Sequence, residues 1–264
     1  MSDTTDSNTT SAGTPMSTWL KRGVIAAVVL VALVYGAIFF YANVLNNSPD
    51  ALDTDDLADA LVTTVVETEE TATTDAAVPG TAAPAEPSEA VEGFDGIWTP
   101  TTASEFGYRV DEILGGINVT AVGRSNEIEG SLTIDGTTAS VQATVEVANI
   151  ESDDSRRNNA FRTTVMDAEN FPTASFGTTE PIEFGNIPAD GEQVTATATG
   201  ELTLKGVTLP VTVEVTAQAA AGSIGVLGNI PITFTDYGID NPSNPAVSLE
   251  DDGIVEFVLV FQRS

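Results

Sequence analysis

The stretch ATGELTLKGVTLPVTVEVT, residues 198–216, alternates apolar and polar side chains on both sides of a turn, as two paired β-strands do. The apolar members of the alternation are Ala198, Leu202, Leu204, Leu209, Val211, Val213 and Val215. Successive side chains of a strand point to opposite faces, so these residues form one apolar row. Gly206 supplies the positive φ that a tight reversal needs. Because an isolated hairpin is marginally stable in water, the apolar row must be buried against further strands.

The remainder of residues 96–264 supplies those strands. Apolar runs bounded by turn residues predict strands near residues 106–110, 132–134, 141–150, 174–178, 193–204, 209–219, 228–234 and 254–262. Asp135-Gly136 predicts a hairpin turn after the second of them. Residues 155–172 differ, because they predict a short helix that carries Phe161 and Val165. Roughly eight strands with turns between them indicate an all-β domain, either a sandwich or a closed barrel.

Composition excludes several classes of function. The 264 residues contain no Cys and no His, which excludes disulfides, thiolate nucleophiles, His-based triads and nearly all zinc sites. The formal net charge is −30 with only 9 Lys and Arg, so the chain lacks the basic surface that binds nucleic acid. Acidic runs such as Glu250-Asp251-Asp252 lack the spacing of a calcium loop, and no metal site is expected. The acidity indicates either an adaptation to solvent outside the cell or a recognition surface.

The N-terminal part of the chain changes character twice. Residues 1–18 are rich in Ser and Thr without apolar periodicity, which predicts a disordered tail. Residues 23–45 contain no charged side chain, and a helix of that length measures about 34 Å, enough to cross a hydrocarbon core of about 30 Å. Because Lys21 and Arg22 lie on the N-terminal side only, residues 19–45 are predicted to be a transmembrane signal anchor with a cytoplasmic N-terminus. A cleaved signal peptide is the alternative, but its apolar run would be shorter.

Residues 46–95 have the composition of a spacer. They hold 13 acidic and no basic side chains, with Thr, Ala and Pro between them. Such a stretch buries too little apolar area to offset chain entropy, and its like charges repel one another. We therefore expect a disordered acidic linker that keeps the domain away from the bilayer. Within it, residues 51–66 place Leu52, Leu57, Leu61 and Val65 near one helical face, so a short helix is the alternative there.

Four pieces of the chain occur in a fixed order. The first is W-x-x-x-x-x-S-x-F-x-Y-x-V at residues 98–110, and the second is VGRSNEIEGSLTID at residues 122–135. The third is IESDDSRRNNAFRTTVMDAENFPTASF at residues 150–176, and the fourth is the hairpin quoted above. Each piece alone is unspecific, whereas the ordered set covers nearly all of residues 96–264 and resembles the YceI family of lipocalin-like, polyisoprenoid-binding proteins.

The resemblance implies an eight-stranded antiparallel barrel over residues 96–264, with an elongated apolar interior that holds one slender ligand. The side chains expected to line that interior are Phe106, Tyr108, Val110, Phe161, Phe176, Leu202, Leu204, Val211, Val213, Ile232 and Phe234. At any one of these positions, packing in a filled core is the alternative to lining a cavity.

The polar residues expected at the cavity mouth, where a ligand head group would lie, are Arg124, Arg157, Asn158 and Lys205. Cations are scarce in this acidic domain, so contact with an anionic or quinone head group and ordinary pairing with carboxylates are both open. The sequence also departs from the family here. Glu112 and Lys205 stand where members often carry His, and Asn158 stands where they carry Asp. Ser125 and Ile128 stand where members commonly carry Phe.

Together these features predict a non-enzymatic, membrane-anchored, extracytoplasmic binding protein that holds an isoprenoid, a quinone or a similar amphiphilic lipid in an apolar cavity. No catalytic residue and no further cofactor is expected. One alternative is an envelope stress or surface-interaction module with a filled barrel. Another is a carboxylate-dependent hydrolase, for which the sequence sets no pair of acids apart. The expected partners are the lipid and the membrane but no nucleic acid, and a homodimer is open.

Overall fold

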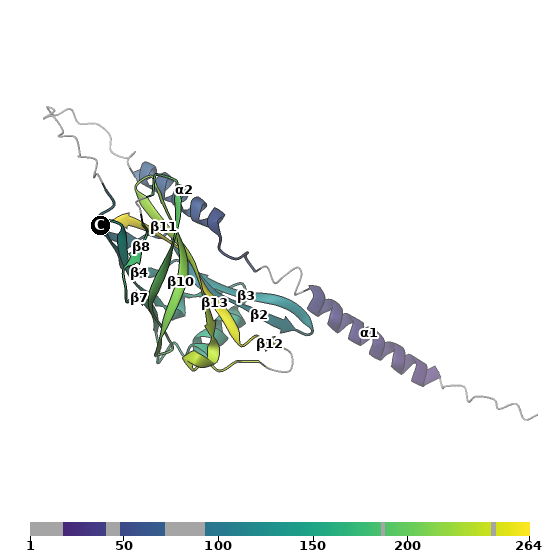
Figure 1. Cartoon of the computed structure of the whole chain (residues 1–264). Coiled ribbons are helices and arrows are strands. Elements are labelled where there is room, and N and C mark those ends of the chain that lie inside the picture. Colours follow the sequence, from purple (N-terminus) through teal and green to yellow (C-terminus); the bar gives the residue numbers. More distant parts are fainter. Residues whose placement is uncertain (1–17, 41–47, 72–92, 186–187, 244–246) are drawn as a thin grey trace, which may run out of the picture. The chain divides into compact units, whose positions relative to one another are not determined.

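The computed structural model describes residues 18–40, 48–71, 93–185, 188–243 and 247–264 (Figure 1). The chain divides into two units, Met1–Leu45 and Asn46–Ser264. The strands of the second unit are β1 (Gly96–Pro100), β2 (Glu105–Leu114), β3 (Ile117–Ser125), β4 (Ile128–Asp135), β5 (Thr138–Glu146), β6 (Glu151–Ser152), β7 (Thr173–Thr178), β8 (Ile182–Glu183), β9 (Gln193–Leu204), β10 (Val207–Ala220), β11 (Ser223–Thr233), β12 (Val247–Leu249) and β13 (Asp252–Arg263). Its helical elements are α2 (Thr54–Thr71), η2 (Val147–Asn149), α3 (Ser155–Ala160), η3 (Phe161–Val165) and η4 (Phe234–Tyr237).

Eight of these strands close into a barrel. They pair in the order β1, β4, β5, β7, β9, β10, β11, β13, and β13 returns to pair with β1. Every pairing is antiparallel, which confirms the predicted eight-stranded antiparallel barrel. The first part of β13 pairs with β2, and β2 forms a hairpin with β3. The short strands β6, β8 and β12 add to β3, β5 and β2.

The local predictions around the turns are confirmed. β9 and β10 pair along the predicted hairpin, and both residues of its turn, Lys205 and Gly206, have positive φ values of 48° and 76°. Gly136 turns the chain between β4 and β5 with a φ of 61°. The predicted short helix is α3 followed by the π-helical turn η3, and the side chain of Asp154 caps α3 by accepting a hydrogen bond from the backbone N–H of Arg156 at 2.8 Å.

Helix α1 (Thr18–Phe40) is the regular element of the first unit. Its large apolar side chains are exposed, among them Ile25, Leu30, Leu33, Tyr35 and Phe39. Within the described part of the chain, no helix is both long enough and apolar enough to span a membrane. The predicted disordered tail falls almost entirely outside the described residues, as do residues 41–45 of the predicted anchor.

The structure differs from the predicted linker over residues 54–71, which form helix α2. The helix that the spacing of Leu residues offered as an alternative is confirmed. Leu52, Leu57 and Leu61 are buried against Leu227 of β11 and against Val258 and Val260 of β13, and Figure 1 shows α2 beside these strands. The physical reason is that Leu57 and Leu61 on one face of α2, together with Leu52 just before it, bury enough apolar area to outweigh the acidic composition. Residues 72–92 of the predicted linker lie outside the described residues.

The segment before α2 is fixed to the barrel by a charged cluster. Glu256 of β13 is fully buried and pairs with Arg109 at 3.2 Å and with Arg124 at 2.9 Å. The same two guanidinium groups donate to backbone carbonyls of the segment, Arg109 to Pro49 at 2.8 Å and Arg124 to Asp50 at 2.6 Å. Two cations thus balance one buried carboxylate while they hold residues 48–52.

Replacing Leu57 by Ala should destabilise the barrel unit by about 2–5 kcal/mol, because Leu57 is 0% exposed and its loss leaves a cavity beneath α2. The measurement is denaturant unfolding of the full-length chain, followed by far-UV circular dichroism. Val62→Ala is the matched control on the same helix, since Val62 is 63% exposed and its loss should change stability by less than about 0.5 kcal/mol. Equal effects of the two substitutions would contradict the docking of α2.

Candidate binding cavity

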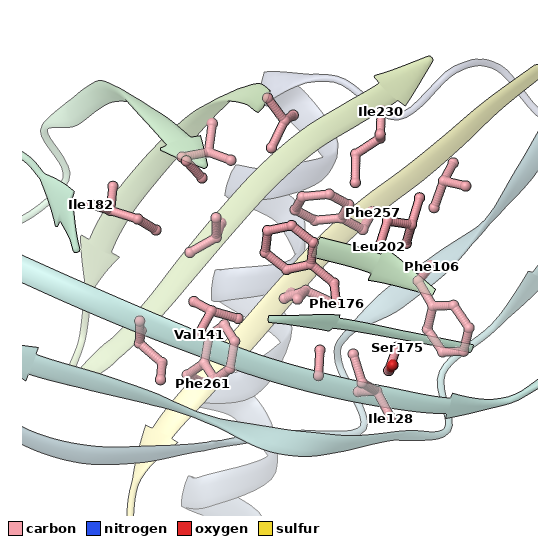
Figure 2. Close-up of a pocket in the computed structure, with 18 of the residues that line it drawn as sticks. Phe106, Ile128, Val141, Ser175, Phe176, Ile182, Leu202, Ile230, Phe257 and Phe261 are labelled. Atoms are coloured by element: carbon pink, nitrogen blue, oxygen red, sulfur yellow. The ribbon is translucent and has the colours of Figure 1, made fainter. Parts of the chain in front are cut away.

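The inward faces of the barrel strands enclose an apolar cavity, and Figure 2 shows side chains such as Phe106, Phe176 and Phe257 directed into it. Its volume is about 130 Å³, counted as the space open to the centre of a water-sized sphere. The lining residues are Phe106, Ile128, Leu132, Ile134, Val141, Ala143, Val145, Ala174, Ser175, Phe176, Ile182, Phe184, Ala198, Leu202, Leu204, Val213, Val215, Ala217, Ile224, Val226, Ile230, Val255, Phe257, Leu259 and Phe261.

The chemistry of this lining is uniform. Ser175 has the only polar side chain among the lining residues, and none of them is charged. A charged group placed there would lose its hydration without gaining a partner, whereas an apolar chain gains from leaving water. The arrangement therefore suits a slender apolar chain.

One end of the cavity is sealed by packed side chains. Tyr108 of β2 stacks on Phe161 of η3, with ring centroids 4.6 Å apart. Val110 and Phe234 are buried in the same apolar cluster. The Tyr108 ring lies over Gly123 of β3, where an added Cβ would approach the ring to 2.4 Å. Glycine at this position thus makes room for the seal.

The predicted lining residues divide between the cavity and this seal. Phe106, Phe176, Leu202, Leu204 and Val213 line the cavity. The others, Tyr108, Val110, Phe161, Val211, Ile232 and Phe234, belong to the apolar cluster around it and are not among its lining residues. Lining a cavity and packing in a filled core were the alternatives at each predicted position. In the structure both occur, at different levels along the axis of one barrel.

Sequence reasoning missed most of the lining. β13 contributes Val255, Phe257, Leu259 and Phe261, whose period-two spacing points them all inward. β4 contributes Leu132 and Ile134 from residues already assigned to a strand. Residues 257–261 are all apolar, so alternation could not separate this inward row from the outward Val258 and Val260, which pack against Leu57 and Leu61 of α2.

The four predicted head-group residues are placed outside the lining of the cavity. Arg124 pairs with Glu256 and with Glu105, on the face of β3 opposite to Gly123. Lys205 lies in the turn between β9 and β10. Ordinary pairing with carboxylates therefore accounts for the contacts of Arg124.

Arg157 and Asn158 lie on α3 at the sealed end. Arg157 pairs with Glu112 at 3.1 Å and also with Asp153. Burial lowers the pKa of Arg157, but these two carboxylates outweigh it, so the pKa is raised and the guanidinium stays charged. Asn158 accepts a hydrogen bond from the backbone N–H of Ser152 at 2.7 Å, which ties α3 to β6. Across the described residues, no group of three or more acidic side chains is arranged to hold a metal ion.

The sequence profile of the YceI-like domain matches residues 99–261, more than half of the chain. The chain belongs to the YceI family. The match begins in β1 and ends in β13, so it spans the barrel and its cavity.

Relatives and solved structures agree with this assignment. A UPF0312 protein of Pseudomonas paraeruginosa is 29% identical over 134 residues, which cover 47% of this chain and 66% of the relative, slightly under two thirds. A UPF0312 protein of Shewanella denitrificans is 30% identical over 146 residues, covering 51% of this chain and 73% of the relative. A polyisoprenoid-binding domain from Saccharophagus degradans, implicated in plant cell wall breakdown, aligns with a TM-score of 0.50 and 17% identity over 64% of this chain and 98% of that domain. At this identity the likeness shows a shared fold.

The seal should make the stability of this YceI-family barrel depend on pH in alkali. Burial raises the pKa of Tyr108 to about 12, and the nearby guanidinium of Arg157 opposes part of that rise. Unfolded tyrosine titrates near 10, so the folded state holds the proton more tightly. The resulting stability is complete below about pH 10 and is lost as the pH rises toward 12, a change on the order of 3 kcal/mol.

Denaturant unfolding of the parent chain and of Tyr108→Phe at several pH values between 9 and 12 measures this contribution. The parent should lose more stability than the variant over that range. Absorbance titration of the phenolates should show one late transition in the parent that is missing in the variant. Parallel loss of stability in the two proteins would contradict the buried phenol.

Proposed function

We propose that this YceI-family protein binds an isoprenoid lipid, a quinone with an isoprenoid tail, or a similar amphiphile in the cavity of its barrel. The observation that carries the proposal is the apolar lining, which contains no charged side chain. Each methylene moved from water into such a site contributes about 0.8 kcal/mol. A tail of several isoprene units therefore provides the affinity without any polar contact.

The comparisons support this proposal. The chain belongs to the YceI family, and the Saccharophagus degradans domain with the same fold is described as polyisoprenoid-binding. The lining offers no pair of titratable groups for acid–base chemistry, so the proposed role is binding rather than catalysis. The alternative function, an envelope module with a filled barrel, does not require the cavity. Lipid analysis of the purified protein distinguishes this function from lipid binding.

Full-length chain purified in mild detergent should carry close to one isoprenoid-tailed molecule per protein, measured by mass spectrometry of organic extracts. Ala143→Phe fills the lining from β5 and should lower this occupancy severalfold. Thr144→Phe is the matched control, because the neighbouring side chain is exposed on the outer face. Both variants should keep the β-rich circular dichroism of the parent. Absence of tailed lipid from the parent, or equal occupancy in both variants, would contradict the proposal.

The proposed function includes an N-terminal membrane anchor with the barrel on the extracytoplasmic side. Support for it comes from the 23 residues between Gly23 and Leu45, none of which is charged. The described apolar side chains of α1 are exposed, as a lipid-facing helix requires. Lys21 and Arg22 precede the apolar run and no cation follows it before Arg109, which favours a cytoplasmic N-terminus.

Protease added to intact cells that express the full chain should degrade the barrel and spare an epitope tag fused before Met1. The physical reason is that the basic flank keeps the N-terminus inside the cell. Immunoblots with antibodies to the tag and to the barrel read out the two sides, and lysed cells provide the control in which both are cut. Protection of the barrel in intact cells would reverse the orientation, and release of the barrel by carbonate washing would contradict the anchor.

A further inference from the structure

A second, smaller apolar pocket of about 40 Å³ adjoins the cavity at the end opposite to the seal. The two spaces share Ile134, Phe184, Ala217 and Ile224 as lining residues. The rest of its lining, which we call the rim, is formed by Phe94, Gly136, Pro188, Val194, Gln218 and Ala219. Because the pockets share residues from three strands and from Phe184, the smaller one adjoins the larger across Phe184.

The rim leads to solvent. Gly136 is exposed, and Phe94, Pro188 and Gln218 are partly exposed. Phe184 stands between the two spaces and is held by its backbone N–H, which donates to the carbonyl of Thr137 at 3.0 Å. At the other end, Tyr108 stacks on Phe161 within the apolar cluster that fills the barrel there. An apolar chain thus meets a continuous apolar path at the rim and packed aromatic rings at the seal.

Acidic side chains surround the rim. Each of five exposed acids lies next to a rim residue or to Phe184 in the sequence, or in the turn between Pro188 and Val194: Asp95, Asp135, Glu183, Asp190 and Glu192. Asp95 accepts a hydrogen bond from the N–H of Gly136 at 2.7 Å, and Asp190 accepts one from the N–H of Ala221 at 3.2 Å. The first bond places the carboxylate of Asp95 at the rim, and the second places that of Asp190 beside Ala221, two residues after Ala219 of the rim.

Positive charge at the rim is limited to Arg263 among the described residues adjoining it. Its guanidinium donates to the carbonyls of Asp95 and Gly93, both at 2.7 Å, and lies 5.0 Å from the centre of the Trp98 ring. The arginines that pair with acids lie elsewhere, on β2, β3, α3 and η3. A phosphate group at the rim would therefore be repelled by several carboxylates.

We propose that the ligand enters the barrel through the rim, apolar end first, and that the acidic side chains there exclude isoprenoids with a phosphate head group in favour of neutral ones. The proposal rests on the proposed function, since it concerns the same cavity. The head group then lies among Asp95, Asp190 and Gln218, where neutral hydroxyl or carbonyl groups find hydrogen-bonding partners or water. Repulsion should weaken binding of a phosphorylated chain by about tenfold at low ionic strength.

The test uses two synthetic probes of the same isoprenoid chain, each with a diazirine next to the head group, one an alcohol and the other its monophosphate. The full-length chain in neutral detergent is irradiated with each probe, and the labelled peptides are identified by mass spectrometry. The alcohol should label peptides that contain the rim, about tenfold more than the monophosphate does at low salt. Added salt should narrow the difference.

Two pairs of variants test the charge selection at the rim and the entry route of the ligand separately. Asp190→Asn with Glu192→Gln should raise labelling by the monophosphate, whereas Glu201→Gln with Glu214→Gln, on the exposed face of β9 and β10, should leave it unchanged. Phe184→Trp should slow labelling by the alcohol because the larger ring narrows the path between the pockets. Phe161→Trp, at the seal, is its control and should leave the rate near that of the parent.

The outcomes distinguish this proposal from the proposed function. If neither probe labels any cavity or rim peptide, the proposed function fails. If the alcohol labels the cavity but its head group reacts around Arg157 and Lys205, the function stands and the route is overturned. If both probes label the rim equally and the Asp190 and Glu192 substitutions change nothing, the charge selection is overturned.

Discussion

The hydroxyl of Ser104 bridges a break in the barrel wall between β1 and β2. β13 pairs with β1 and with β2 in succession, so the edge that it faces is interrupted between them. Ser104 bridges the interruption, since its Oγ accepts from the N–H of Val260 at 3.0 Å and donates to the carbonyl of Val260 at 3.2 Å. A buried N–H without a partner costs about 1–3 kcal/mol, so this side chain replaces the missing strand neighbour.

In the closed barrel, the two faces of β13 contact different parts of the protein. Phe257 and Phe261 point into the cavity, whereas Glu256, Val258 and Val260 point outward and are covered by residues 48–61. The outer cover is therefore part of the barrel wall rather than a tether. Because β13 is buried on both faces, its local unfolding is disfavoured. The hollow interior is thereby kept from collapsing.

The sequence was sufficient for seven of the eight barrel strands, the two hairpin turns and the short helix, because period-two alternation and glycine-containing turns are local signals. It did not predict β1, the short strand that closes the barrel against β13, and the strand predicted at residues 106–110 is β2, which lies outside the closed ring. The sequence also correctly predicted that five side chains line the cavity: Phe106, Phe176, Leu202, Leu204 and Val213. Alternation alone could not tell these from Tyr108 and Phe161, since whether an inward side chain meets space or a neighbour depends on how η3 folds over the barrel. The docking of α2 was only an alternative, because its partners on β11 and β13 lie far away in the sequence.

The distribution of charge is compatible with the apolar ligand proposed for so acidic a chain. With a net charge of −30, the few arginines of the domain are mainly used to balance carboxylates that must be buried or packed, such as Glu256 and Glu112. None of them faces the cavity, so affinity there must come from apolar area and from shape. Apolar area by itself discriminates poorly between tails, and an isoprenoid longer than the main cavity has to continue past Phe184 toward the rim. Under the proposal above, discrimination between ligands therefore falls to the rim, where the apolar lining meets charged side chains.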